Sequence, residues 1–301
     1  MKEKIFTVPD GTTIITEGMI PSNVTNVIIP DGVKKIENYA FKCCESLENI
    51  IIPKGVEAIG RGAFCYCASL KNIILPEGIK GIYHETFCYC ESLENIIIPK
   101  GVEAIADSAF EYCSSLKNII IPKGVKHIGD SAFYYCESLE NIILPEGIEY
   151  IADSAFAYCR SLKSIILPEG ITVICDRTFK NCESLKNIII PKGVEAITEF
   201  AFENCKSLKN IILPEGIEYI GKYAFKDCKS LENINIPEGT EHIGAFAFYQ
   251  CESLKNINIP KEVKLIGQYA FNGCKTFETI TFPKGLERMY KRAMYGCDVI
   301  K

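Results

Sequence analysis

The sequence predicts an α/β repeat fold, a right-handed solenoid with a parallel β-sheet, and its regular spacings lead to this prediction. Proline recurs every 23 residues from Pro30 to Pro283, which marks twelve units. Phenylalanine keeps the same interval from Phe41 to Phe271, and cysteine keeps it from Cys44 to Cys297. One unit follows the pattern P-x-G-V-x-x-I-x-x-x-A-F-x-x-C-x-S-L-x-N-I-x-I. A chain that coils once per unit brings equivalent residues of successive units into columns.

The elements of one unit follow from its local sequence. Residues 47–52 are rich in isoleucine and end at Pro53, which predicts a strand. Residues 53–55 predict a turn, because proline fixes φ and glycine permits a positive φ. Residues 56–59 alternate apolar and polar side chains, which predicts a second, shorter strand. Residues 63–67 place apolar side chains at i, i+1 and i+4, a spacing that predicts a single helical turn.

The units are expected to stack as one solenoid domain over residues 1–301. A single unit of 23 residues buries too few apolar side chains to offset the entropy lost on ordering, so it depends on its neighbours. Residues 1–29 lack the A-F-x-x-C segment and are predicted to form a degenerate N-terminal cap. Residues 30–282 form eleven full repeats, and residues 283–301 a truncated last repeat. No polar C-terminal cap is evident, which predicts an exposed edge able to self-associate.

The repeat pattern L-x-x-I-x-I-P-x-x-V-x-x-I-x-x-x-A-F-x-x-C-x-S-L resembles the BspA-type (Treponema-type) leucine-rich repeat, from about Pro30 to Cys297. The resemblance implies a leucine-rich-repeat solenoid whose strands form the concave face. It also implies a binding role, often that of a surface adhesin for host matrix proteins. One departure is that the position between the last two strand isoleucines, more often polar in the family, is mostly isoleucine here.

Composition excludes several classes of protein. No apolar run is long enough to cross a membrane, so no membrane insertion is expected. The formal net charge is −5, and Lys and Glu are interleaved, which argues against a nucleic-acid binder. The first residues turn polar at once and show no secretory signal, which favours the cytoplasm. The resemblance favours the alternative, a cell-surface or secreted location.

The cysteine column predicts buried structural thiols, and no metal or other cofactor is expected. Stacked side chains point the same way, and a reducing compartment would not favour disulfides between them. Cys43, Cys65, Cys88 and Cys175 lie outside the column. Cys65 and Cys88, next to Cys67 and Cys90, suggest a four-thiolate zinc site, but copying of the unit explains the spacing better.

No set of residues predicts an enzyme. His127 and His242 share a repeat position five units apart, and His84 lies elsewhere, so no pair can bind a metal or activate a nucleophile. Residues 216–223 nearly match a phosphate-binding loop, but Tyr223 replaces its hydroxyl residue and no long helix is predicted to follow. The chain is therefore expected to be non-catalytic.

The favoured binding surface is a column of isoleucines that strand alternation turns away from the core. Aligned apolar side chains form a patch that monomers rarely leave exposed, which predicts a protein partner or self-association. The alternative is that curvature and the stems of long charged side chains cover it. Lys186 and Lys209 break a column of alternating Glu and Lys and make a small basic spot beside it. The isoleucine column consists of Ile51, Ile74, Ile97, Ile120, Ile143, Ile166, Ile189 and Ile212.

A second stripe is aromatic. Tyrosine is amphipathic and common in recognition surfaces, so this stripe suggests an alternative function as a carbohydrate-binding surface protein. The competing interpretation is packing of aromatic rings from unit to unit. The tyrosine column consists of Tyr66, Tyr89, Tyr112, Tyr135 and Tyr158.

Overall fold

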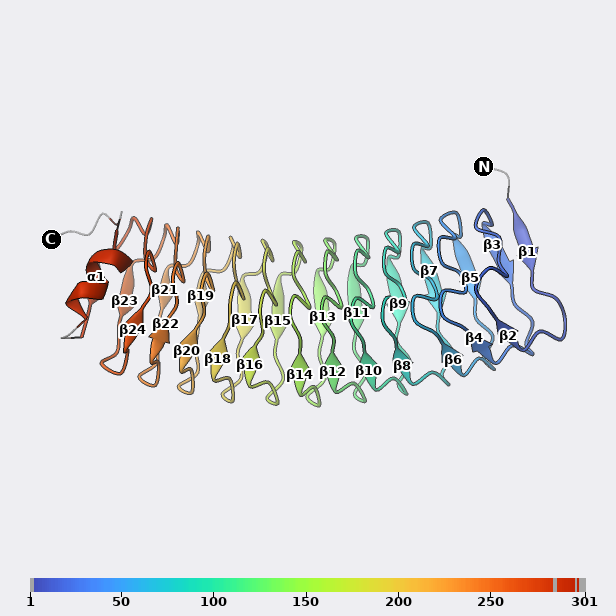
Figure 1. Cartoon of the computed structure of the whole chain (residues 1–301), viewed down its shortest axis with the longest axis horizontal. Helices are drawn as coiled ribbons and strands as arrows, with labels where there is room; N and C mark the ends of the chain where they lie inside the picture. Colours follow the sequence, from blue (N-terminus) through green and yellow to red (C-terminus); the bar gives the residue numbers. More distant parts are fainter. Residues whose placement is uncertain (1–2, 284–285, 296, 298–301) are drawn as a thin grey trace. The chain divides into compact units, whose positions relative to one another are not determined.

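The structure, a computed structural model, describes residues 3–283, 286–295 and 297. Each repeat forms one rung, with a long strand of two or three residues, a proline-containing turn, a short strand of two residues and a compact return segment (Figure 1). The chain divides into two compact units, Met1–Glu149 and Tyr150–Lys301. The predicted parallel-strand solenoid with a 23-residue repeat is confirmed, because paired strand residues lie 23 positions apart, as in Ile50 and Ile73. A single domain over residues 1–301 stays a prediction.

In the first unit, the long strands form one parallel sheet in chain order, and the short strands form the sheets β2-β4-β6 and β8-β10-β12. The long strands are β1 (Ile5–Thr7), β3 (Asn26–Ile28), β5 (Asn49–Ile51), β7 (Asn72–Ile74), β9 (Asn95–Ile97), β11 (Asn118–Ile120) and β13 (Asn141–Ile143). The short strands are β2 (Ile14–Ile15), β4 (Lys35–Ile36), β6 (Ala58–Ile59), β8 (Gly81–Ile82), β10 (Ala104–Ile105) and β12 (His127–Ile128).

In the second unit, the short strands β16 to β24 form one sheet, whereas the long strands form two sheets, β15-β17 and β19-β21-β23-β25. The long strands are β15 (Ser164–Ile166), β17 (Asn187–Ile189), β19 (Asn210–Ile211), β21 (Asn233–Ile234), β23 (Asn256–Asn258) and β25 (Thr279–Thr281). The short strands are β14 (Tyr150–Ile151), β16 (Val173–Ile174), β18 (Ala196–Ile197), β20 (Tyr219–Ile220), β22 (His242–Ile243) and β24 (Leu265–Ile266), and the one helix described is α1 (Glu287–Ala293).

A ladder of phenylalanine rings forms the centre of the core in each unit. The phenylalanines that recur every 23 residues from Phe41 to Phe271 are fully buried. Neighbouring rings within a unit stack, and the distance between their centroids ranges from 4.9 Å for Phe41 and Phe64 to 5.7 Å for Phe156 and Phe179. The inward-facing isoleucines of both strand types and the leucine of each S-L pair are also buried. The buried apolar positions therefore match the repeat pattern.

The return segment differs from the single helical turn that the sequence predicted. Its backbone forms consecutive turns, in which the Cys67 N–H donates to the Phe64 carbonyl at 3.1 Å. The intervening N–H of Tyr66 donates instead to the Cys88 carbonyl of the next rung at 2.8 Å. Tyr66 has a φ of 63°, in the left-handed region. Bonds between rungs thus replace the i to i−4 bonds of a helix, and the left-handed residue prevents a helical turn.

The ends of the chain also differ in part from the predictions. Residues 1–29 carry both strand types, and β1 pairs with β3 through Ile5 and Asn26, so this cap lacks only the return segment. At the other end, α1 packs against the short strand β24, whereas the long strand β25 is the last strand of its sheet among the described residues, so the exposed edge stays a prediction. The Tyr269 N–H donates to the Arg292 carbonyl in this helix, and Ala293 is buried. Met289 replaces the isoleucine of earlier repeats, and Arg292 replaces Tyr269 of the preceding repeat, and both new residues favour a helix more than those they replace, which explains the helix.

Candidate interaction surface

The isoleucine column is exposed to solvent on the outer face of the long-strand sheets, the face that points away from the core. All eight side chains are between 59% and 85% exposed. Each long strand alternates in burial, so that in β5 Asn49 and Ile51 are exposed while Ile50 between them is buried. The same alternation in β7, β9, β11 and β13 aligns five of these isoleucines in the first unit. Neighbouring charged stems therefore do not cover the column.

Ion pairs join neighbouring rungs along the charged column beside the isoleucines. Lys71 pairs with Glu48 at 3.6 Å, and Lys117 pairs with Glu94 at 3.4 Å. In the second unit, Glu232 accepts ion pairs from Lys209 at 3.0 Å and Lys255 at 3.2 Å. Pairs this exposed contribute little stability, and their main effect is to avoid columns of like charge.

The predicted basic spot is reduced to Lys186. Lys209 is paired with Glu232, as described above. Lys186 is exposed, and no ion pair joins it to another residue that the structure describes. Its column neighbours one repeat away are Lys163 and Lys209, both cationic. A complementary anion here would have to come from outside this column.

The tyrosine column is a stack of rings. Tyr66, Tyr89, Tyr112 and Tyr135 pack with centroids 4.4–4.7 Å apart and interplanar angles of 9–12°. The fifth predicted member, Tyr158, belongs to the second unit and is half-buried. Each ring inside the stack is covered on both faces by its neighbours. Only ring edges are therefore open along most of the column.

A second aromatic column, which sequence reasoning missed, lies in the second unit. Phe200, Tyr223, Phe246 and Tyr269 stack with centroids 4.8–5.1 Å apart. All four adopt a φ between 58° and 60°, as the tyrosine column does at another position of the repeat. The signal was available, because these aromatics recur every 23 residues two positions before the buried phenylalanine.

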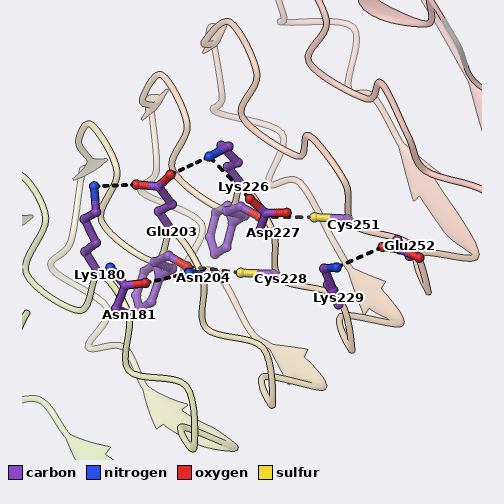
Figure 2. Close-up of polar contacts among 12 residues, drawn as sticks. Lys180, Asn181, Glu203, Asn204, Lys226, Asp227, Cys228, Lys229, Cys251 and Glu252 are labelled. Carbon is purple, nitrogen blue, oxygen red and sulfur yellow. Dashed lines mark hydrogen bonds and ion pairs between the residues drawn. The ribbon is translucent and has the colours of Figure 1, made fainter. Parts of the chain in front are cut away.

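Cationic side chains surround this second aromatic column and meet a buried carboxylate. Glu203 is 7% exposed and is held by Lys180 at 2.8 Å and Lys226 at 2.7 Å, from the rungs on either side (Figure 2). Lys180 also lies over the ring of Phe200, with Nζ 5.1 Å from the centroid. Burial alone raises the pKa of Glu203, but hydrogen bonds from both lysines outweigh it and the pKa is lowered. Glu203 is therefore ionised, and the cluster fastens three rungs together.

The cysteine column has a structural role in hydrogen bonding. The Cys90 thiol donates to the Phe64 carbonyl of the preceding rung at 3.2 Å, and equivalent bonds recur in both units. The same carbonyl also accepts the Cys67 N–H, so both of its lone pairs are used. Burial raises the pKa of these thiols, to about 11 for Cys44. The column is therefore made of inert structural thiols, as expected.

The residues considered for metal or nucleotide binding do not converge. Across the described residues, no three His, Cys, Asp or Glu side chains are grouped so that they could hold a metal ion. Cys65 and Cys88 contact each other, and Cys88 lies 3.9 Å from a Glu111 oxygen. His84 contacts Asp107 at 3.4 Å, whereas His127 and His242 belong to different units. Residues 216–223 form a turn, the strand β20 and another turn.

No helix among the described residues has the length and apolar character needed to span a bilayer. The one helix described, α1, has seven residues.

Comparison with known proteins identifies the repeat. The family described as "BspA type Leucine rich repeat region (6 copies)" matches residues 12–140, 80–209, 126–251 and 195–301. No curated protein matches the chain. Among solved structures, a leucine rich cell surface protein from Faecalibacterium prausnitzii is 28% identical with a TM-score of 0.63, and the match covers 97% of this chain and 90% of that protein. A leucine-rich repeat protein from Bacteroides ovatus is 28% identical with a TM-score of 0.52, and the match covers 99% and 92%.

A third structure supports the fold alone. The pneumococcal vaccine antigen PcpA is 21% identical with a TM-score of 0.62, and the match covers 99% of this chain and 87% of that antigen. The family match extends over almost the whole chain and agrees with the observed rungs. The chain therefore belongs to the BspA-type leucine-rich repeat family.

Proposed function

We propose that the chain is a non-catalytic, adhesin-like interaction module that binds a protein partner through its isoleucine column. The observation that carries this proposal is the exposure of all eight isoleucines, none below 59%. Within each unit, an exposed apolar stripe of this kind typically marks an interface in proteins of known function. Affinity would come from burial of the isoleucines, and specificity from the column of alternating Glu and Lys beside them and from exposed strand asparagines such as Asn49.

The test substitutes Ile97, Ile120 and Ile143 together with lysine. All three are at least 60% exposed, so the fold should tolerate lysine. The matched control replaces three exposed apolar residues near the short strands, Tyr83, Tyr150 and Leu265, with lysine and adds the same charge.

Binding to a panel of purified host matrix proteins is measured by biolayer interferometry. The isoleucine variant should lose at least about tenfold in affinity, because each buried isoleucine contributes about 1.5–3 kcal/mol. The control should bind as the original protein does. Equal affinity of both variants, with unchanged circular dichroism, would refute the use of this face.

The carbohydrate alternative has less support. Sugar rings stack on open aromatic faces, and the faces inside the tyrosine column are covered by neighbouring rings 4.4–4.7 Å away. It stays a prediction. A glycan array on which Tyr112→Ala removes specific signals would support it over the protein-binding proposal.

We place this activity at the cell surface and not in the cytoplasm. Support comes from the relative described as a leucine rich cell surface protein, which is matched over 97% of this chain. Antibody labelling of intact cells of the source organism should detect the protein, and labelling only after permeabilisation would contradict a surface location.

A further inference from the structure

An open hollow of about 880 Å3 lies on the outer face of the second unit, beside the isoleucine column. It lies over β17 and the start of β19, and Ile189 and Ile212 are both among its lining residues. Ile212 is 85% exposed, more than any other member of the column. The volume is within the range of sites that receive small ligands or single side chains.

The hollow coincides with a break in the long-strand sheet. In the part of the chain that the structure describes, β15 pairs with β17 and β19 pairs with β21, but no ladder joins β17 to β19. The two strands remain neighbours in contact. Three lysines follow one another in the charged column here, Lys163, Lys186 and Lys209, where other rungs alternate in sign. β15 and β17 stay paired although Lys163 and Lys186 precede them, so like charge alone does not account for the break, and the three lysines make the charged column locally cationic beside the hollow.

The rim of the hollow has a net positive charge. Lys186 precedes the lining residue Asn187 and has no ion pair with any described residue. On the other rim lie Lys192 and Glu215, which share a repeat position one rung apart. No ion pair joins these two side chains, although both lie in the described part of the chain. A ligand that binds here should therefore carry net negative charge, to complement two lysines and one glutamate.

We infer that this hollow is the anchor point for an extended segment of the partner protein, in which one bulky apolar side chain enters between Ile189 and Ile212 and flanking carboxylates meet Lys186 and Lys192. From residue 186 to residue 192 an extended chain spans about 20 Å, so a segment of five or six residues covers the site. Apolar anchors in pockets with charged rims dominate many protein interfaces. This inference rests on the proposed function and names the chemistry of the segment that the isoleucine face binds.

The probe is a capped pentapeptide with a central phenylalanine between pairs of aspartates. Two control peptides carry alanine at the centre or lysines on the flanks. Each is titrated into the full chain labelled at the isoleucine δ1 methyl groups, and methyl NMR spectra report which isoleucines shift. We expect saturable shifts at Ile189 and Ile212, with about tenfold weaker binding for the alanine peptide and weaker binding still for the lysine peptide.

The matched variants are Ile212→Asn and Ile51→Asn. Asparagine already occupies the same repeat position at Asn235 and Asn258, so the fold accepts it. Ile212→Asn should weaken binding of the acidic peptide about tenfold, and Ile51→Asn should leave it unchanged. Lys186→Glu, which restores the alternation of charge, should weaken it about two- to fivefold.

Several results would overturn the inference. Shifts spread evenly along the whole column, or equal binding of the acidic and lysine-flanked peptides, would remove the specific anchor. Shifts at Ile212 that grow with protein concentration in the absence of peptide would identify a second copy as the occupant.

Failure of the proposed function can be told apart from failure of this inference. If the triple lysine variant at Ile97, Ile120 and Ile143 binds matrix proteins normally while the peptide still binds at the hollow, only the proposed function fails.

Discussion

Glu203 offers a direct test of how burial changes the stability that a cluster of ion pairs contributes. Its side chain is 10% exposed and contacts Lys180 at 2.8 Å and Lys226 at 2.7 Å. Glu232 has the same arrangement, with a lysine from each neighbouring rung at 3.0 and 3.2 Å, but its side chain is 29% exposed. The two glutamates therefore form a matched pair that differs mainly in solvent access.

The perturbation is Glu203→Gln, with Glu232→Gln as the control. Removing one partner of a buried ion pair costs about 3–5 kcal/mol, because the opposite charge stays buried and uncompensated. Lys180 and Lys226 are 23% and 27% exposed, so part of this penalty is relieved by water and we expect about 2–4 kcal/mol. The control should cause no measurable change, since solvent screens its pairs.

Hydrogen exchange with mass spectrometry measures the free energy of local opening, which suits a repeat protein that need not unfold in one step. Peptides covering residues 198–230 should exchange faster in the Glu203 variant and not in the control. Equal effects of the two substitutions, or faster exchange around Glu232 alone, would refute the reasoning from burial.

The same cluster predicts a dependence on pH. The pKa of Glu203 is lowered in the folded chain, so its stabilising effect is fully present above the unfolded value and is lost as the pH falls through the folded value. The difference in opening free energy between the original protein and Glu203→Gln should therefore shrink as the pH falls from about 6 to about 3. An unchanged difference would show that the carboxylate charge is not what stabilises these rungs.

Three further predictions concern the core, the strained turns and the thiols. Phe225→Ala should cost about 3–5 kcal/mol in urea unfolding, because the ring is fully buried between two others, and Phe225→Leu should recover part of the loss. Tyr112→Asn should change the free energy of thermal unfolding by less than about 1 kcal/mol. Asparagine adopts the left-handed φ of 58° with less strain than tyrosine, and this gain offsets the lost ring stacking. A larger loss of stability would contradict this balance. Brief alkylation of the native protein should modify exposed Cys43 and spare the adjacent Cys44, whose pKa burial raises to about 11, and peptide mass spectrometry should show this.

Most of the fold could be predicted from the sequence, because the repeat fixes both register and burial. A constant interval of 23 residues requires equivalent residues to lie side by side, and alternation within each strand then separates Ile50 from Ile51. The exposure of the isoleucine column follows from the same rule. The buried phenylalanine ladder and the inert cysteine column also follow from position alone.

The parts that were missed depend on contacts between rungs or on one unusual repeat. The return segment has helical spacing, but the Tyr66 N–H bonds to the next rung, which no pattern within one repeat reveals. Helix α1 arises from substitutions confined to residues 286–293, which an averaged consensus conceals. The hollow beside Ile212 lies where β17 and β19 are not paired, and the residues of these strands do not differ in pattern from those of the paired β15 and β17, so the hollow could not be predicted from the sequence.

The hydrogen bonds between rungs also bear on how such a gene can change length. The Cys182 thiol reaches back 26 residues to the Phe156 carbonyl, and the same step recurs at Cys205 and Phe179. Recombination that adds or deletes one whole copy would reconnect each donor to an equivalent acceptor and leave no orphaned group. Loss of a single residue would instead displace every later side chain in its rung to the wrong face. Selection on this chain should therefore tolerate drift in copy number far more readily than small insertions or deletions.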